Sequence, residues 1–424
     1  MVLNKKIFSI IFLSLTILSF FFGFFLRENS AGGGFTDSIW EWNNYLLLKK
    51  DFSLFLTKDY FAGRIPLYHF LNIKLNPFIN NNKDFINFNF LYSFFVPFFF
   101  YIALKKNFIQ LANYKIYLIV TIILLNPYVR TSSYWGLQEN LAYIFLFLSF
   151  IFFSSNNFII KKYFTIFFSF LAFYADQKFL ILPIVFFFYF LNVKNLKFNY
   201  LILLFLNNIR LISFCFILIM PAIFIFYLWD FKISGPAAQT LSIRPQNFLS
   251  FIQIVSIPLL PLIILRKGVL NNIKIIIRKN FFYIILFVIF YFIVRYFFFS
   301  GDAAFGGGWA YKIFQILKIN NVLFSEFFYF LISLFSFLLF LFFFYFIEIN
   351  LINMMIFFYF SALALFVPTI FQEYFDPLFF LLIIFLIDKK FFINLSFLRL
   401  VIVNIYYSIF LISCIFYYQV WIKL

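Results

Sequence analysis

Two acidic side chains in the first polar stretch of the chain have the spacing of a proton-transfer site. Asp37 and Glu41 lie four residues apart in SAGGGFTDSIWEWNNYLLLKK, residues 30–50, so in a helix they share one face, one turn apart. A positioned carboxylate can take the proton of an attacking hydroxyl group, which typically contributes roughly 10²–10⁴-fold to a rate. The preceding triplet Gly32–Gly34 permits a tight turn or a close approach of backbone N–H groups to a ligand. We predict that Asp37 is a catalytic base.

More ionisable residues stand at the ends of the apolar segments that follow. A charge in hydrocarbon costs about 2.5–3.5 kcal/mol or more, so such residues usually pair with one another or face a cavity. The candidates for substrate binding are Glu41, Arg64, Arg130, Glu139, Asp176, Lys178, Arg295, Asp302 and Glu373. Asp302 precedes a second glycine triplet, Gly306–Gly308, whereas the lone His69, beside aromatic residues, is interpreted as a hydrogen-bonded interface residue. Carboxylates, cations and a lipid-facing site together suit sugar transfer from a lipid phosphate to a hydroxyl group.

The scaffold for these residues must lie in a membrane. The chain of 424 residues is 65% hydrophobic and only 11% charged, with a mean hydropathy of +1.01, which excludes a soluble domain. We predict an all-α, polytopic transmembrane helix bundle that forms a single domain over residues 1–424. Apolar runs predict about 11–13 spans, with thirteen at 7–26, 84–104, 115–126, 139–153, 162–174, 179–192, 211–229, 248–265, 281–299, 322–347, 351–367, 377–388 and 398–419.

The basic residues orient this scaffold. The net charge is +18, and in a membrane protein Lys and Arg mainly fix topology, so no nucleic-acid partner is expected. With the first helix starting inside and remaining uncleaved, the Lys-Lys pairs at 5–6, 105–106, 161–162 and 389–390 fall in the cytoplasm. Of the 15 acidic residues, all but Glu348 and Asp388 then fall on the outer face. The 82 Phe residues are interpreted as lipid-facing filler, and the two Cys residues predict no disulfide or metal site.

The first outer loop, residues 27–83, is the longest polar stretch. Its segment FTDSIWEWNNYLLLKK predicts an amphipathic helix in the membrane interface, anchored by Trp40 and Trp42. In the following YFAGRIPLYHFLN, Gly63 and Pro66 break the helix. The loop therefore predicts interfacial helices that carry Asp37 and Arg64 over one membrane face.

This layout resembles the GT-C superfamily of polyprenyl-phosphate-sugar-dependent glycosyltransferases. The resemblance covers most of the chain in layout and lies in the acidic first-loop helix, the G-R-x-P-L-Y turn and the many spans. YWGLQENLAYIFLFLSF, FYADQKFLILP and GDAAFGGGWAYK are also similar to segments of the dolichyl-phosphoglucose α-1,2-glucosyltransferases. The resemblance implies an inverting transfer with Asp37 as base, and Glu139 binding acceptor or a divalent metal ion. One acid precedes Trp40 where many relatives carry an Asp-Glu pair.

The expected partners are a polyprenyl-phosphate sugar donor, a glycan or lipid-linked acceptor, and membrane lipids, with no certain cofactor. The AT-rich codon usage implied by the composition points to a bacterial inner membrane, with the active face in the periplasm. A polysaccharide polymerase or flippase is an alternative, although the outer loops after the first are short. A secondary transporter is another, although the sequence has no internal symmetry and its prolines cluster near span ends.

Overall fold

The computed structural model describes residues 2–60, 64–192, 204–232, 243–266, 268–298, 309, 312–313, 322–367 and 370–420. The predicted all-α class is confirmed, because these residues form helices and connections without a strand. Backbone contacts divide the chain into two compact units, Met1–Thr240 with Tyr407–Lys423, and Leu241–Tyr406. The prediction of one membrane-embedded domain stays a prediction, and the units are described separately below.

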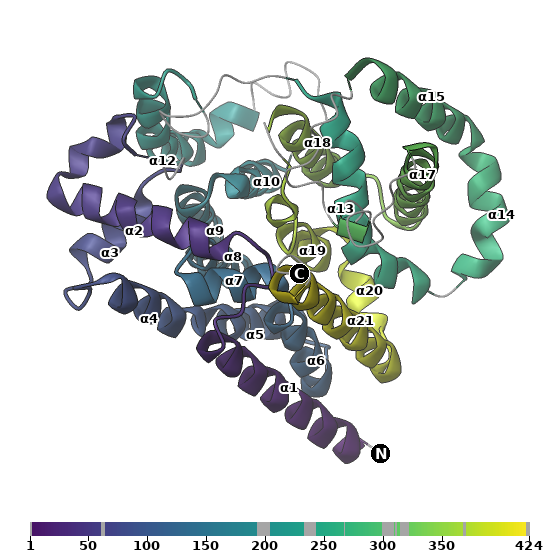
Figure 1. Cartoon of the computed structure of the whole chain (residues 1–424), viewed down its shortest axis with the longest axis horizontal. Helices are drawn as coiled ribbons and strands as arrows, with labels where there is room; N and C mark the ends of the chain where they lie inside the picture. Colours follow the sequence, from purple (N-terminus) through teal and green to yellow (C-terminus); the bar gives the residue numbers. More distant parts are fainter. Residues whose placement is uncertain are drawn as a thin grey trace. The chain divides into compact units, whose positions relative to one another are not determined.

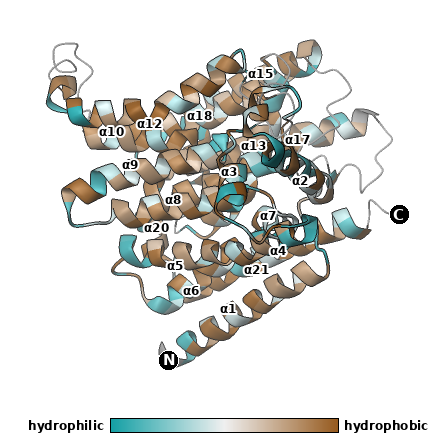
Figure 2. Ribbon diagram, turned by 90° about the vertical axis from the view of Figure 1, so that its left-hand side faces the viewer, coloured by the Kyte–Doolittle hydropathy of each residue, from teal (hydrophilic) through white to brown (hydrophobic). Residues whose placement is uncertain are grey.

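Long apolar helices identify an integral membrane protein. Eight helices of the described residues are long and apolar enough to cross a membrane: Asn4–Phe25, Asn82–Asn107, Phe158–Ala175, Ile209–Leu228, Pro245–Ile264, Phe281–Phe298, Phe324–Phe346 and Phe397–Val420. Figure 2 shows the helices coloured mainly as hydrophobic, with hydrophilic residues concentrated at helix ends and connections. The predicted transmembrane helix bundle is therefore supported by length and composition.

Several predicted spans are broken or short. Asn113–Leu124 and Pro127–Trp135 pass the same test only together and bend by 62° at their junction, which gives up to nine spans. Three more apolar helices, Glu139–Phe153, Gln177–Leu191 and Leu351–Phe366, have 10–17 residues. The predicted count of about 11–13 is reached only if these shorter helices are included. Pro221 and Pro258 lie inside helices away from their ends, against the expectation that prolines cluster near span ends, whereas Pro261 is close to the end of α13 at Ile264.

The first unit contains the polar first loop and the helices that surround it. Its helices are α1 (Val2–Phe25), α2 (Gly34–Lys50), η1 (Phe52–Leu56), α3 (Leu67–Lys74), α4 (Asn82–Ser93), α5 (Phe95–Asn107), α6 (Asn113–Leu124), α7 (Pro127–Trp135), α8 (Glu139–Phe153), α9 (Phe158–Ala175), η2 (Gln177–Leu180), α10 (Ile181–Leu191) and α12 (Ile209–Leu228). Within it, α1 runs along α6 and α8 packs along α9 (Figure 1).

The second unit covers Leu241–Tyr406. Its helices are α13 (Pro245–Ile264), α14 (Val269–Lys279), α15 (Phe281–Phe298), α17 (Val322–Phe346), α18 (Leu351–Phe366), η3 (Gln372–Tyr374), α19 (Leu378–Leu382), the π-helix η4 (Ile383–Ile387) and α20 (Lys389–Asn394). The last helix, α21 (Phe397–Ile415), begins in this unit, and from Tyr407 onward it belongs to the first unit, where it continues into the π-helix η5 (Phe416–Val420). Within the unit, α13 packs against α15, α17 and α18.

The first polar loop, residues 27–83, is folded, and the predicted helix in it is present as α2. The buried side of α2 carries Glu41, Asn44, Tyr45 and Leu48, which recur at helical spacing, while Trp40 is exposed. Tyr45 packs with Tyr68 of α3 and Phe85 of α4, and Leu48 packs with Tyr60 and Trp229. The loop is therefore held by an aromatic core, and Glu41 points towards protein.

Helix α7 is the clearest departure from the predicted topology, which treated residues 127–135 as part of an outer connection. Asn126 caps this helix by accepting hydrogen bonds from the backbone N–H groups of Tyr128 (3.0 Å) and Val129 (3.2 Å). Pro127 occupies the first turn, where its missing N–H costs no hydrogen bond. Every residue of α7 except Trp135 is buried, so its polar side chains need partners inside the protein.

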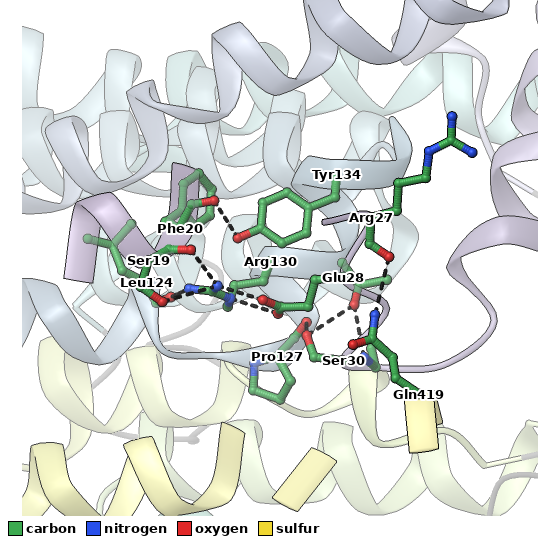
Figure 3. A network of polar contacts seen from close by, with 12 residues as sticks. Ser19, Phe20, Arg27, Glu28, Ser30, Leu124, Pro127, Arg130, Tyr134 and Gln419 are labelled. Carbon is green, nitrogen blue, oxygen red and sulfur yellow. Dashed lines mark hydrogen bonds and ion pairs between the residues drawn. The ribbon is translucent and has the colours of Figure 1, made fainter. Parts of the chain in front are cut away.

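A buried ion pair joins Glu28, in the turn that follows α1, to Arg130 of α7. Arg130 donates from Nε to Glu28 Oε1 (2.8 Å) and from Nη2 to Glu28 Oε2 (2.6 Å), a bidentate arrangement (Figure 3). It also donates to the carbonyl oxygens of Ser19 (2.9 Å) and Leu124 (3.3 Å). Tyr134 Oη donates to the Phe20 carbonyl at 2.7 Å. The last turns of α1 are thus tied to α7, and the first loop starts from a fixed point.

The glycine triplet Gly32–Gly34 comes shortly after Glu28 in the chain. Ala31 N–H donates to Thr131 Oγ1 of α7 at 2.9 Å. Gly32 has a left-handed φ of 77°, and a Cβ there would lie 2.1 Å from the Tyr418 ring. A Cβ on Gly34 would lie 2.7 Å from Thr131 Cγ2 and from Trp135 Cδ1. The triplet makes a tight turn packed closely against neighbouring side chains, which sets where α2 begins.

Replacing Glu28 with Gln tests whether the pair with Arg130 holds this region. Because the Glu28→Gln substitution leaves a buried guanidinium without its counter-ion, we expect a loss of roughly 3 kcal/mol in unfolding free energy. The measurement is thermal unfolding of the purified protein in detergent. The matched control is Glu348→Gln at an exposed position, with an expected change of at most about 0.5 kcal/mol. Equal stability of the two variants would contradict the assignment.

Candidate functional site

Arg64 is the centre of a group of charged side chains in the first unit. Its Nη1 lies 2.6 Å from Glu139 Oε1 and 3.8 Å from Asp176 Oδ2. Tyr60 Oη donates to the Arg64 carbonyl at 2.8 Å, which fixes the backbone ahead of α3. The Arg64 side chain keeps 23% of its surface exposed, whereas both carboxylates are buried. One cation therefore serves two acids from separate helices.

Glu139 is positioned by the sharp turn between α7 and α8. Gly136 ends α7 with a left-handed φ of 70°, and Tyr68 Oη donates to its carbonyl oxygen at 2.5 Å. Glu139 is the first residue of α8, where the helix dipole favours a negative charge. Its Oε2 accepts a hydrogen bond from Ser132 Oγ at 3.0 Å, while Oε1 faces Arg64. Both carboxylate oxygens thus have polar partners.

Asp176 ends α9 and caps the short helix η2. Its Oδ1 accepts from the backbone N–H of Lys178 at 3.2 Å, and its Oδ2 lies 3.1 Å from Lys178 Nζ. The Lys178 ammonium lies 5.9 Å from the centre of the Tyr143 ring on α8, within cation–π range. The Asp176–Gln177–Lys178 turn therefore places a carboxylate and an ammonium group side by side, next to Arg64.

Glu41 and His69 form the third part of the group. Glu41 Oε2 lies 3.0 Å from His69 Nε2, although the two atoms are not aligned as a hydrogen bond. Gln138, the neighbour of Glu139, donates from Nε2 to Glu41 Oε1 at 3.3 Å. His69 is fully buried, and its ring meets those of Tyr60 and Tyr68 edge-on. From the sequence, His69 was expected only as a hydrogen-bonded interface residue, and Gln138 does not stand out there.

These six side chains are called the polar cluster: Glu41, Arg64, His69, Glu139, Asp176 and Lys178. They come from the first loop, the α7–α8 turn and the α9–η2 turn. With neutral His69 the polar cluster has one more negative than positive charge, so its cations are neutralised by neighbouring acids. Five of its members, all except His69, are among the predicted substrate-binding residues.

The electrostatics of the polar cluster keep Arg64 charged. Burial acts to lower the pKa of Arg64, but the carboxylates of Glu139, Asp176 and Glu41 outweigh it and raise this pKa well above its usual value. Burial raises the pKa of the Tyr60 hydroxyl, and the charge of Glu41 raises it further. Tyr60 therefore stays a neutral donor to the Arg64 backbone, and Arg64 stays a cation that phosphate or carboxylate groups can pair with.

Asp37 lies in the first turn of α2, one turn before Glu41 on the same face of the helix. Its side chain is partly exposed, and a Cβ on Gly33 would lie 3.3 Å from Asp37 Oδ2. The carboxylate thus folds back over the glycine turn that starts the helix. This places Asp37 one turn of α2 away from the polar cluster.

The remaining predicted residues lie elsewhere. Arg130 belongs to the buried α1–α7 pair with Glu28, so its predicted contact with substrate stays a prediction. In the second unit, Arg295 makes a bidentate pair with Glu326, with one bond of 2.8 Å, and Glu373 is partly exposed in η3. Asp302 and the triplet Gly306–Gly308 lie outside the described residues. Within the part of the chain that the structure describes, no three His, Cys, Asp or Glu side chains are grouped to hold a metal ion.

No protein-family model, curated protein or solved structure matches this chain. A function for this protein is therefore inferred from the geometry of the site.

Arg64 should be the most sensitive member of the polar cluster. The Arg64→Met substitution leaves the buried carboxylates of Glu139 and Asp176 with Lys178 as their remaining basic partner. We expect it to lower the unfolding free energy by about 3 kcal/mol, and Arg64→Lys by less, because Lys keeps the charge without the planar fork. The measurement is thermal unfolding in detergent, with Lys58→Met at an exposed site of the same loop as the control.

A double-mutant cycle separates the ion pair from simple packing. If Arg64 and Glu139 stabilise each other, the Arg64→Met/Glu139→Gln variant should be at least about 1 kcal/mol more stable than the two single losses predict together. Additive losses would mean that the two side chains act independently.

Proposed function

We propose that this protein is a membrane glycosyltransferase that moves a sugar from a polyprenyl-phosphate donor to a lipid-linked or periplasmic acceptor. The supporting observation is the polar cluster, which joins three segments distant in sequence inside an otherwise apolar helical scaffold. Buried charges are expensive, and this group includes cations of the kind that bind phosphate. Asp37 stands one helical turn away as the base, as the resemblance to the GT-C superfamily implies.

The reaction uses these groups in separate roles. The acceptor oxygen forms a bond to the anomeric carbon of the sugar while the bond from that carbon to the phosphate oxygen breaks. The hydroxyl proton moves to the Asp37 carboxylate, and the electron pair of the broken bond stays on the polyprenyl phosphate. Arg64 and Lys178 pair with the negative charge that develops on that phosphate. The phosphate thereby replaces the carboxylates of Glu139 and Asp176 as their partner.

The remaining acids bind the acceptor. Glu41 and Glu139 accept hydrogen bonds from its hydroxyl groups, and Glu139 is the residue that a divalent metal ion would use, if the reaction requires one. The site operates in a bacterial inner membrane with its active face in the periplasm, as part of cell-envelope assembly. This placement agrees with the acidic residues predicted on the outer face and the basic pairs predicted inside.

A transporter or flippase for a lipid-linked saccharide is the second candidate, and one observation favours it. The α6–α7 span is bent by 62°, and interrupted helices with charges between them are typical of transporter sites. The two candidates differ in whether a covalent bond breaks. Purified protein in liposomes with a labelled lipid-linked saccharide distinguishes them: movement across the bilayer without change in the lipid would establish transport.

Removing the base should abolish transfer while leaving the fold intact. We expect Asp37→Asn to lower the turnover number by roughly 10²–10⁴-fold, because the acceptor hydroxyl loses its proton acceptor. The measurement is transfer of radiolabelled sugar from polyprenyl phosphate in membranes that contain equal amounts of each variant. Glu41→Gln should raise the acceptor KM and largely keep the turnover number.

Asp51→Asn is the matched control, since Asp51 is exposed on the same loop and caps η1 through hydrogen bonds from Ser53 that asparagine can also accept. Its transfer rate should equal that of the unaltered chain. Unchanged turnover in Asp37→Asn would remove Asp37 as the base. Loss of transfer in all three variants would point to damaged folding.

A further inference from the structure

Helix α14 in the second unit has two contrasting sides. Val269 and Ile276 are buried against the protein. On the outward side, Lys274 and Arg278 are exposed one turn apart, so their side chains lie on one face. Ile275 and Ile277 flank them and are 45% and 37% exposed. The outward side of α14 therefore combines a pair of cations with exposed aliphatic side chains.

The position of α14 is fixed by the ends of three apolar helices. It follows the last turn of α13 and leads directly into the first turn of α15 (Figure 1). The Arg266 guanidinium lies 5.0 Å from the Phe346 ring, and the Lys279 ammonium lies 5.9 Å from the Tyr345 ring. Both rings belong to the final turn of α17. Because α13, α15 and α17 are each able to span a membrane, α14 lies at the level of the lipid headgroups.

The stretch of chain that forms α14 carries charges of one sign. Residues 266–279 read RKGVLNNIKIIIRK, with five basic residues and no acid. Two acids lie outside this stretch but near its ends: Asp388 is paired with Arg266, and Glu348 follows the last turn of α17. Phe282 and Tyr283, at the start of α15, are exposed aromatic residues of the kind that collect at a membrane interface.

We propose that the outward side of α14 is a binding surface for anionic phospholipid headgroups. Lys274 and Arg278 pair with lipid phosphates, while Ile275 and Ile277 enter the boundary between headgroups and acyl chains. The excess of positive charge selects lipids with net negative charge over zwitterionic ones. The surface is separate from the polar cluster, so the proposal does not depend on the transferase assignment.

The test is titration of the purified full-length protein in detergent with phosphatidylglycerol or phosphatidylcholine, with bound lipid counted by native mass spectrometry. One cation near an anionic surface contributes about fivefold in affinity, so Lys274→Gln/Arg278→Gln should bind phosphatidylglycerol about 25-fold more weakly. Binding of phosphatidylcholine should not change. The charge-conserving Lys274→Arg/Arg278→Lys variant should keep the preference for phosphatidylglycerol.

The matched control removes two charges elsewhere. Lys49→Gln/Lys50→Gln, at exposed positions that end α2, should leave phosphatidylglycerol binding within about twofold of the unaltered chain. An equal loss in this control would show that net charge alone attracts the lipid, and would overturn the proposal. So would a Lys274→Gln/Arg278→Gln variant that binds phosphatidylglycerol as well as the unaltered chain, or that loses both lipids equally.

Discussion

The arrangement of the first unit depends on one constraint, which is that a carboxylate surrounded by apolar helices needs a cation. Glu139 and Asp176 end up buried at the start of one helix and the end of another, and Arg64 lies within reach of both. An arginine suits this position because its planar guanidinium offers several donors and stays charged. The first loop must fold back over the helix ends to deliver Arg64. Its aromatic core of Tyr45, Tyr68 and Phe85 holds it there.

Two of the arginine–glutamate pairs, Arg130–Glu28 and Arg64–Glu139, differ in how many hydrogen bonds the arginine makes. Arg130 is enclosed, and Glu28 together with the Ser19 and Leu124 carbonyls accepts hydrogen bonds from all three of its guanidinium nitrogens. Arg64 contacts its carboxylates through Nη1 and remains partly exposed. An arginine whose nitrogens are all hydrogen-bonded does not readily change its partner, because any new ligand must displace several hydrogen bonds at once. A partly exposed pair with one shared nitrogen can exchange a carboxylate for a phosphate at much lower cost, which is why the proposal rests on Arg64.

The sequence predicted the class of fold and most of the polar cluster for the same reason. Charges at the ends of long apolar runs are so costly that Glu139, Asp176 and Lys178 stand out without any structural information, whereas Arg64 was picked out by its place in the polar first loop. Their pairing could not be predicted, since the Arg64–Glu139 contact spans 75 positions and the Arg130–Glu28 contact spans 102. Helix α7 was missed because its polar residues resemble a loop until their buried partners are known. Glu41 was expected to bind substrate, and its burial against His69 and Gln138 depends on contacts across the fold that the sequence does not show.

The aromatic residues do more than face lipid, because some of their rings lie against arginine side chains. Phe20 and Tyr134 lie 5.7 and 5.5 Å from the Arg130 guanidinium, and Phe346 and Phe391 lie 5.0 and 4.9 Å from that of Arg266. An aromatic face offers negative potential without a hydrogen-bond acceptor, so it stabilises a cation in surroundings where water is scarce. At Arg130 and Arg266 the rings add to the hydrogen bonds and ion pairs that these arginines already make. A chain rich in phenylalanine can keep a few permanent cations inside its helices, and those cations in turn fix where the buried acids must lie.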